Sequence, residues 1–572
     1  MSRNTESHFG MVPSKNIKRS SFKKPHSHKT TFNTGDIVPI YAEEVLPGDT
    51  AKIHTASLVR MLTPINPVMD NAWMDTYYFF VPRRLLWQHW KEFMGENTND
   101  AWTQTTEYQI PQVTAPEGGW QKGTIAEKIT GIQGREFSMD ALYFRAYVAI
   151  FNEWFRNENI TEPAELSLGD ATTEGSNGGD YVTDLQKGGK MAKAVKYADY
   201  FTRALPEPQK GPDIYLPLGT SAPLNIAGEY IQAGGDGKNL GMVSWGATEP
   251  NEYAFSGLVV RETGNVETWL EKEGSEIFSH TTAPIGTIPR DSYLGVTPDG
   301  RYSGLRAQIP ENAYADLSKA TAATINQLRQ AFAVQRMYEV DARGGTRYTE
   351  ILRAHFGVVS PDARQQRPEY LGGKRVPINI TQVIQQSATD ATSPQGTAAA
   401  YSLTIDNHDD FTKSFDEHGI IMGLAVIRTE HSYQQGLNRR FSRKNRTDFY
   451  FPELANIGEQ YIKNKELFVQ GTSEDEEAFG YQEAWAEYRY STNIVSGELN
   501  SDYATPLDSW TYADDYSQLP TLSDEWIRET DINVARTLAI QNQDQWIADF
   551  YFDETWVRPM PIYSIPSLAG WS

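Results

Sequence analysis

The sequence predicts a mainly β fold, an antiparallel β-sandwich with helical and loop insertions between its strands. Residues 73–81, WMDTYYFFV, are rich in β-prone aromatic side chains, and residues 545–563, QWIADFYFDETWVRPMPIY, alternate apolar and polar residues over much of their length. An apolar run at 420–427 is typical of a strand buried on both faces. Helical periodicity is confined to segments between these strands. The patterns alone do not choose among antiparallel topologies.

The N-terminal part of the predicted sandwich begins at residue 36. Residues 37–55, IVPIYAEEVLPGDTAKIHT, indicate two extended runs joined by a turn at Pro47–Gly48. Pro82 is expected to begin a short amphipathic helix that ends at Gly95. Further along, the sequence predicts a loop at 96–135, a helix at about 138–157 and a second loop at 161–190.

Two more helices are predicted in the second half of the chain, at 317–343 and 347–356. Asp316 and Thr346 are suited to cap their N-termini, and Gly344, Gly345 and Gly357 to end them, because helix C-termini favour residues that tolerate positive φ. Apolar residues at helical spacing are expected on the buried sides: Ile325, Leu328, Phe332 and Met337 in the first helix, and Ile351, Leu352 and Phe356 in the second.

Positive charge is concentrated at the N-terminus of an otherwise acidic chain. The formal net charge is −22, yet residues 1–30 hold seven Lys or Arg residues against a single Glu. The arm at 1–35 contains few apolar residues, so we expect it to be disordered by itself. A basic arm on an acidic body favours contact with a polyanion. The candidate nucleic-acid contacts in this arm are Lys15, Lys18, Arg19, Lys23 and Lys24.

A second basic cluster, RRFSRKNR, occupies residues 439–446 and contains no acidic residue. Aromatic residues interrupt and follow it, at Phe441 and at 449–451. Cations neutralise phosphates while rings stack on unpaired bases, which is the sequence-tolerant mode of single-strand binding. The alternative is that the cations pair with acidic residues of the body or of a neighbouring subunit. The candidates are Arg439, Arg440, Arg443, Lys444 and Arg446.

The texture of the chain changes between about 224 and 312. Thirteen glycines lie between Gly228 and Gly304, acidic residues outnumber basic ones twelve to six, and apolar periodicity is weak. We therefore expect a segment without strong secondary structure that adds little to a core. Its large aromatic residues need a partner surface, such as other copies at a symmetry axis. The candidate contacts are Trp245, Tyr253, Phe255, Trp269, Phe278 and Tyr293.

Motifs for catalysis, cofactors and metals are incomplete or missing. The chain has no Cys and contains neither HExxH nor GxSxG. Residues 406–417 space Asp406, His408, Asp410 and Glu417 as in a calcium loop, but Phe411 occupies the position that requires glycine. No apolar run is long enough for a signal peptide or a membrane span. We expect a soluble protein without cofactor, metal, enzymatic activity or membrane insertion.

Long sequence blocks resemble one family over nearly the whole chain outside 224–312. They include ATINQLRQAF (323–332), DARGGTRYTEILRAHFGVVSPDARQQ (341–366), RPEYLGG (367–373), PIYAEEVLPGDT (39–50), FFVPRRLLWQHWKEFMGEN (79–97), YQQGLNRRFSRKNRTDFYFP (433–452), FGYQEAWAEYRY (479–490) and VRPMPIYSIPSL (557–568). On these blocks the chain resembles the major capsid proteins of gokushoviruses, which are small single-stranded DNA phages of the Microviridae.

The resemblance implies an eight-stranded antiparallel viral jelly roll that self-assembles into a T=1 icosahedral shell around circular single-stranded DNA. It divides the chain into a basic arm (1–35), a first jelly-roll part (36–223), a variable insertion forming threefold surface protrusions (224–312) and a second part (313–572). The implied partners are other copies of the chain, viral DNA, a small basic DNA-binding virion protein, an internal scaffolding protein and a host surface receptor. Assembly would occur in the bacterial cytoplasm, and the mature location would be the virion.

Two alternatives from other classes remain open at this point. Acidity and abundant Trp and Tyr are compatible with a soluble β-sandwich that binds glycans or acts as a glycosidase, although no catalytic motif supports it. The basic cluster is also compatible with a non-capsid single-strand binding protein. Neither alternative predicts a closed shell, so particle formation separates them from a capsid protein.

Overall fold

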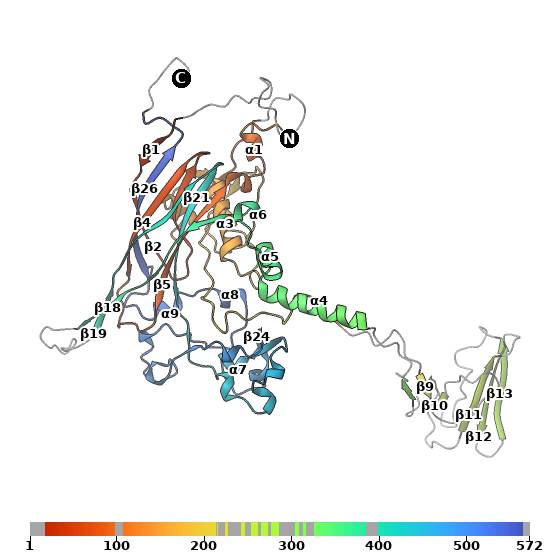
Figure 1. The fold of residues 1–572 in the computed structure, drawn as a ribbon. Coiled ribbons are helices and arrows are strands. Elements are labelled where there is room, and N and C mark those ends of the chain that lie inside the picture. Colours follow the sequence, from red (N-terminus) through yellow and green to blue (C-terminus); the bar gives the residue numbers. More distant parts are fainter. Residues whose placement is uncertain are drawn as a thin grey trace. The chain divides into compact units, whose positions relative to one another are not determined.

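The computed structural model describes residues 18–97, 107–212, 214, 325–384 and 398–563, together with the backbone of seven strands between 224 and 315. The chain divides into two compact units, of which the smaller comprises residues 213–335. The larger unit contains the rest of the chain, and its centre is a pair of packed antiparallel sheets (Figure 1).

Each of the two central sheets has five strands, all paired antiparallel. The first sheet runs in the order β1 and β2, β26, β4, β20, and the second in the order β16 and β17, β5, β21, β3. The first contains β1 (Ser20–Lys23), β2 (His26–Phe32), β4 (Thr50–Met61), β20 (Thr404–Ser414) and β26 (Trp546–Arg558). The second contains β3 (Val38–Val45), β5 (Ala72–Pro82), β16 (Glu369–Gly372), β17 (Arg375–Pro377) and β21 (Gly419–Thr429).

The main hydrophobic core lies between these sheets. It receives every second residue of β26, including Phe550 and Phe552, and packs them against Ile40, Tyr78 and Ile421 of the opposite sheet. This alternation is the pattern that the sequence predicted for a half-buried C-terminal strand. The mainly β, antiparallel sandwich is thus confirmed, while the eight-stranded jelly-roll arrangement stays a prediction.

Strand β21 is buried along nearly its whole length. Ile421 faces the core between the sheets, whereas Met422 and Leu424 belong to a second core on the outer side. That second core is formed with helix α3 (Ala141–Ile150). A side chain at Gly423 would lie 2.8 Å from Tyr41 Cβ and from the Tyr78 ring, so only glycine fits this crossing. The predicted strand buried on both faces is confirmed.

The prediction of a disordered arm at 1–35 is wrong for the part that the structure describes. Strands β1 and β2 both pair with β26, with Phe22 opposite Trp556 and Phe32 opposite Trp546. Their polar composition does not matter here, because backbone hydrogen bonds to an existing strand edge fix them and Phe32 enters the core. Lys15 lies outside the described residues.

The helices differ in detail from their predictions. The helix expected at 82–95 is two short turns, Arg83–Leu85 and α1 (Trp90–Phe93), and the one at 138–157 is α3 followed by a wide turn at Phe151–Phe155. The next two are α4 (Ile325–Gly344) and α5 (Tyr348–Phe356). Arg347, not Thr346, precedes α5, and Asp316 lies outside the described residues. The expected burial is wrong for Phe332, Met337 and Phe356, which are 65%, 46% and 72% exposed.

Shorter elements complete the larger unit. They are β6 (Gln112–Thr114), α2 (Ile125–Thr130), β7 (Ser138–Asp140), β8 (Thr173–Glu174), α6 (Asp362–Gln365), β18 (Ile380–Ile384), β19 (Ala398–Ser402), β22 (Ser432–Tyr433), β23 (Glu459–Lys463), α7 (Asn464–Leu467), β24 (Ala478–Glu483), β25 (Asn493–Ile494), α8 (Asp524–Ile527) and α9 (Ile532–Ala535). The calcium-like window at 406–417 lies in β20 and the turn that follows it. Its residues therefore lie mostly along an extended strand and do not form a calcium-binding loop.

The smaller unit contains strands where the sequence predicted no strong secondary structure, so that expectation is wrong. Short strands such as NVETWLEK have enough β-branched and aromatic residues to pair locally. Strands β11, β12 and β13 form an antiparallel meander that carries Tyr253, Phe255, Trp269 and Phe278, and Trp245 lies in β10. Tyr293 lies outside the described residues. The bounds are β9 (Leu224–Ile226), β10 (Met242–Trp245), β11 (Tyr253–Val260), β12 (Asn265–Lys272), β13 (Glu276–Pro284), β14 (Gly304–Ala307) and β15 (Ala313–Ala315).

A buried charge cluster lies just beyond β21. His431 Nδ1 is 3.0 Å from Asp514 Oδ1 and its Nε2 is 3.3 Å from Glu529 Oε2, while Lys196 Nζ is 3.6 Å from Asp514 Oδ2. Burial disfavours the imidazolium, but the two carboxylates outweigh it and raise the pKa of His431 to about 10. Burial also opposes ionisation of Asp514, yet His431 and Lys196 hold the pKa of that carboxyl well below its usual range.

The His431 cluster predicts a stability maximum at mildly acidic pH. A raised histidine pKa stabilises the folded state fully below about pH 6.5, and this stabilisation is lost progressively as the pH rises to about 10. The depressed pKa of Asp514 has the opposite sign, since its contribution is lost as the pH falls below about 4. Urea midpoints of the subunit measured from pH 5 to 9 should therefore decrease with pH. If the urea midpoint of His431→Gln decreased with pH as steeply as that of the unchanged protein, this assignment would be contradicted.

Candidate nucleic-acid interface

The cluster at 439–446 is held by two short turns that fix which side chains point outward. The first is Arg439–Phe441, where the Asn438 side chain accepts a hydrogen bond of 3.1 Å from the Arg440 backbone N–H. The second is Arg446–Asp448, where the Asp448 carboxylate accepts bonds of 2.7 Å from the backbone N–H groups of Lys444 and Asn445. Caps of this kind organise short polar segments that have no core of their own.

Two of the five cations turn inward and pair with acidic residues of the body. Arg443 Nη2 lies 3.0 Å from Glu487 Oε1, with both side chains largely buried. Arg439 Nη1 lies 3.9 Å from Glu466 Oε1, and its Nη2 donates a hydrogen bond of 3.1 Å to the Tyr461 carbonyl. For these two arginines the ion-pair interpretation holds.

The other three cations, Arg440, Lys444 and Arg446, are exposed and have no carboxylate within 4.0 Å among the described residues. Arg440 lies over the Phe441 ring and Arg446 over the Phe451 ring, each with its guanidinium carbon 5.1 Å from the centroid. These exposed cations, next to the exposed Phe441 ring and the half-buried Phe451 ring, form a surface that can contact phosphate and base together.

The structure does not bring the N-terminal cations to this surface. Lys24 pairs with Glu43 at 2.6 Å, whereas Lys18, Arg19 and Lys23 are exposed on or just before β1. Figure 1 shows β1 and α7, the helix that supplies Glu466, at opposite ends of the larger unit. The two predicted basic groups are therefore separate surfaces.

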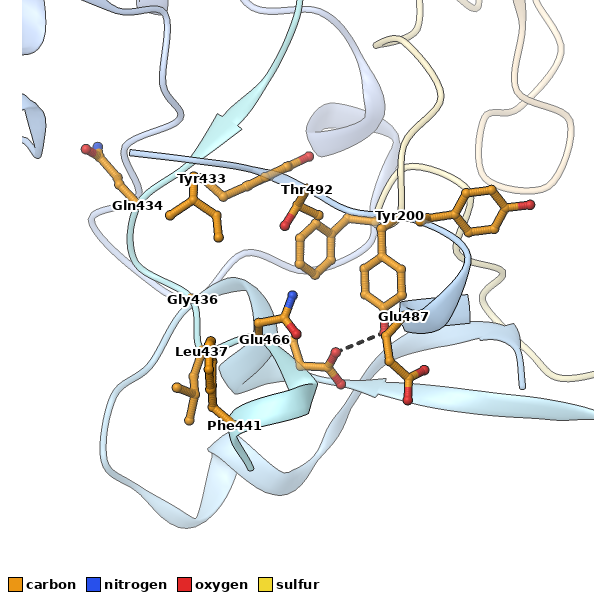
Figure 2. Close-up of a pocket in the computed structure, with 13 residues that line it drawn as sticks. Tyr200, Tyr433, Gln434, Gly436, Leu437, Phe441, Glu466, Glu487 and Thr492 are labelled. Atoms are coloured by element: carbon orange, nitrogen blue, oxygen red, sulfur yellow. Dashed lines mark hydrogen bonds between the residues drawn. The ribbon is translucent and has the colours of Figure 1, made fainter. Parts of the chain in front are cut away.

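Next to the cluster is a pocket that the sequence did not predict (Figure 2). It has a volume of about 190 Å³ and combines side chains from four separate segments of the chain. The hydroxyl of Tyr200 donates a hydrogen bond of 2.9 Å to Glu466 Oε2, and burial raises the pKa of this carboxyl despite the nearby Arg439. Its lining consists of Tyr200, Phe201, Tyr433, Gln434, Gly436, Leu437, Asn438, Phe441, Glu466, Glu487, Tyr490, Thr492 and Ile494.

Comparison with known proteins defines the class first. Residues 10–568 match the family model described as "Capsid protein (F protein)". Three similar relatives, each called capsid protein VP1, come from Spiroplasma virus 4, Bdellovibrio phage phiMH2K and Chlamydia phage 1. They are 40%, 39% and 38% identical to this chain over 98%, 100% and 98% of its length, and over 97%, 99% and 97% of their own.

This chain belongs to the F-type capsid protein family of phages. It is a structural component of a virion and not an enzyme, as the resemblance to gokushovirus capsid proteins predicted. None of the helices in the described ranges is long and apolar enough to cross a membrane.

Proposed function

We propose that copies of this chain assemble into a T=1 icosahedral shell around circular single-stranded DNA, with the 439–446 surface on the inner side. Family membership supports assembly, and closed symmetry repeats each contact around a shell. The observation that supports DNA contact is the set of exposed cations Arg440, Lys444 and Arg446, which have no carboxylate partner within the described ranges, on a chain whose net charge is −22. Packaged DNA requires such counter-charge.

The remaining partners follow from the resemblance. A small basic virion protein and an internal scaffolding protein would supply charge and order that this acidic chain lacks. The segment 224–312 would form the outer protrusion at threefold axes and bind a host surface receptor. Its excess of acidic residues suits an outer surface better than one next to DNA.

Replacing Arg440, Lys444 and Arg446 with Ser should reduce packaged DNA while shells still form. Three lost phosphate contacts should lower the salt dependence of single-strand binding by about 2 in the log–log slope. The ratio of absorbance at 260 and 280 nm of purified particles measures the packaged DNA. The matched variant changes Arg439 and Arg443 to Ser, and it should lower subunit stability because Glu466 and Glu487 lose their partners. Normal packaging in the triple variant would contradict the proposal.

A further inference from the structure

We infer that β18 (Ile380–Ile384) is an edge at which two copies of this chain join, each β18 pairing antiparallel with the β18 of the other copy across a twofold axis. This inference rests on the proposed shell and names one of its contacts, by the strand that makes it and the symmetry that relates the two copies. Three observations carry it: an open strand edge, the absence of charge along that edge, and a sequence that matches its own reverse.

Strand β18 has an open edge in the single subunit. Within the described ranges it pairs only with β19, with Gln382 opposite Ala400 (Figure 1). The hairpin of β18 and β19 connects the two sheets of the sandwich, since it follows β17 of one sheet and precedes β20 of the other. A two-stranded hairpin is only marginally stable in water, and further strands stabilise it. A second copy can supply these strands.

The hairpin lacks the features that keep exposed strand edges apart. Soluble proteins usually place charged residues or Pro on such edges, whereas β18 and β19 contain neither. Residues 376–405 include a single charged residue, Asp390, although 22% of the whole chain is charged. Val383, Ile384 and Tyr401 are nevertheless 45%, 52% and 49% exposed. An uncharged edge with exposed apolar side chains is an association site.

A second copy of the same strand is the partner that fits this edge. When a twofold axis relates two antiparallel neighbours, it keeps the two faces of the sheet, so one residue must lie opposite its own copy. A charged residue near the axis would then meet like charge, and self-pairing therefore favours an uncharged run. Nucleic acid would find no cation in β18 or β19.

The register centred on Gln382 gives matched pairs along the whole strand. With Gln382 opposite its copy, Ile380 lies opposite Ile384 of the other copy, and Thr381 lies opposite Val383. These β-branched side chains pack well as cross-strand pairs, and two opposed Gln amides can exchange hydrogen bonds. The two hairpins would form one sheet in the order β19–β18–β18–β19. Twofold symmetry closes the contact at two copies.

The test places single cysteines at each of the positions 380–384 and oxidises the purified particles. The chain has no Cys of its own, so a disulfide can form only between two copies of the introduced residue. Gln382→Cys should convert nearly all chains to dimers on non-reducing gels, because opposed residues have Cα atoms about 4.5–5.5 Å apart, which suits a disulfide. The positions on either side should link poorly, because each lies diagonal to its own copy at about 7–8 Å.

The matched control for exposure is Met69→Cys. Met69 is 70% exposed and belongs to no strand, so this variant should stay monomeric on the same gels. Equal dimer formation at Met69 and Gln382 would show random collision between particles and overturn the pairing. Dimers that stop at two thirds of the chains would place the hairpin at a threefold axis, where one copy in three lacks a partner, and would also overturn it.

A charge at the axis provides the second measurement. Gln382→Lys places two like charges opposite each other, which should weaken the contact about fivefold and lower the yield of closed shells in electron micrographs. Urea unfolding of the subunit should not change, because Gln382 is exposed. Met69→Lys should assemble normally. A normal shell yield from Gln382→Lys would contradict the pairing.

The outcomes separate this contact from the proposed function. If the unchanged chain forms shells that contain DNA but none of the five cysteines links, the pairing of β18 is overturned and the proposed function stands. If the unchanged chain forms no closed shell, both are overturned. A single peak of dimer formation within 380–384, in shells that contain DNA, supports both.

Discussion

Particles that lack residues 228–304 should assemble and package DNA but no longer adsorb to host cells. Strand β9 before the deletion pairs with β15 after it, with Ile226 opposite Ala313, so the two ends of the excised segment are already held together. A short Gly/Ser linker can close the gap. The segment belongs to a separate compact unit, so the packed sandwich keeps its own core.

Sedimentation of labelled particles with host cells measures adsorption, and electron microscopy checks assembly. As a matched control, residues 385–397 between β18 and β19 are replaced by a linker of the same kind, which should leave adsorption intact. Failure of the 228–304 deletion to form shells would place the segment in the shell wall and contradict an attachment role.

His431→Ala should destabilise the subunit by about 3–5 kcal/mol, since it leaves the buried Asp514 and Glu529 without their shared partner. Lys196 remains 3.6 Å from Asp514 Oδ2, but this single ion pair does not replace the contacts that His431 makes with both carboxylates. Urea unfolding of unassembled subunits gives the change in the free energy of unfolding.

The control for this experiment is His54→Ala. His54 Nδ1 also lies 3.0 Å from a carboxylate, that of Asp409, but the Asp409 side chain is largely exposed. Exposed pairs contribute within about 1 kcal/mol, so this variant should change stability little. Equal losses in the two variants would show that burial of the His431 cluster is not what makes it important.

The sandwich could be predicted for those strands whose burial produces a recognisable pattern of apolar residues in the local sequence. Strand β26 alternates because one face meets the core, and β21 is apolar throughout because both faces do. Strands β1 and β2 left no such signal, because their partner is an edge of β26 far away in sequence. Helix α4 misled in the other direction, since its apolar residue Phe332 is exposed in the single chain.

The candidate site could be predicted only as a composition. The run at 439–446 shows five cations in sequence, but it does not show that Arg439 and Arg443 form ion pairs with the body of the protein. Their partners, Glu466 and Glu487, lie on other elements, and such pairings depend on tertiary contacts that no local spacing encodes. The pocket could not be predicted from the sequence for the same reason, because its walls come from segments as distant as Tyr200 and Tyr490.

The pairing of β1 and β2 with β26 also delays completion of the fold during synthesis. The indole N–H of Trp546 donates to the Thr34 hydroxyl across 512 residues of sequence. At ribosomal speeds of about 5–20 residues per second, β4 and the N-terminal strands wait roughly 25–100 s for β26. Until β26 is made, the first sheet lacks the strand that joins β4 to β1 and β2. A chain that ends before β26 therefore cannot complete the core. Nascent or prematurely terminated copies are thereby kept from presenting a finished subunit to a growing shell.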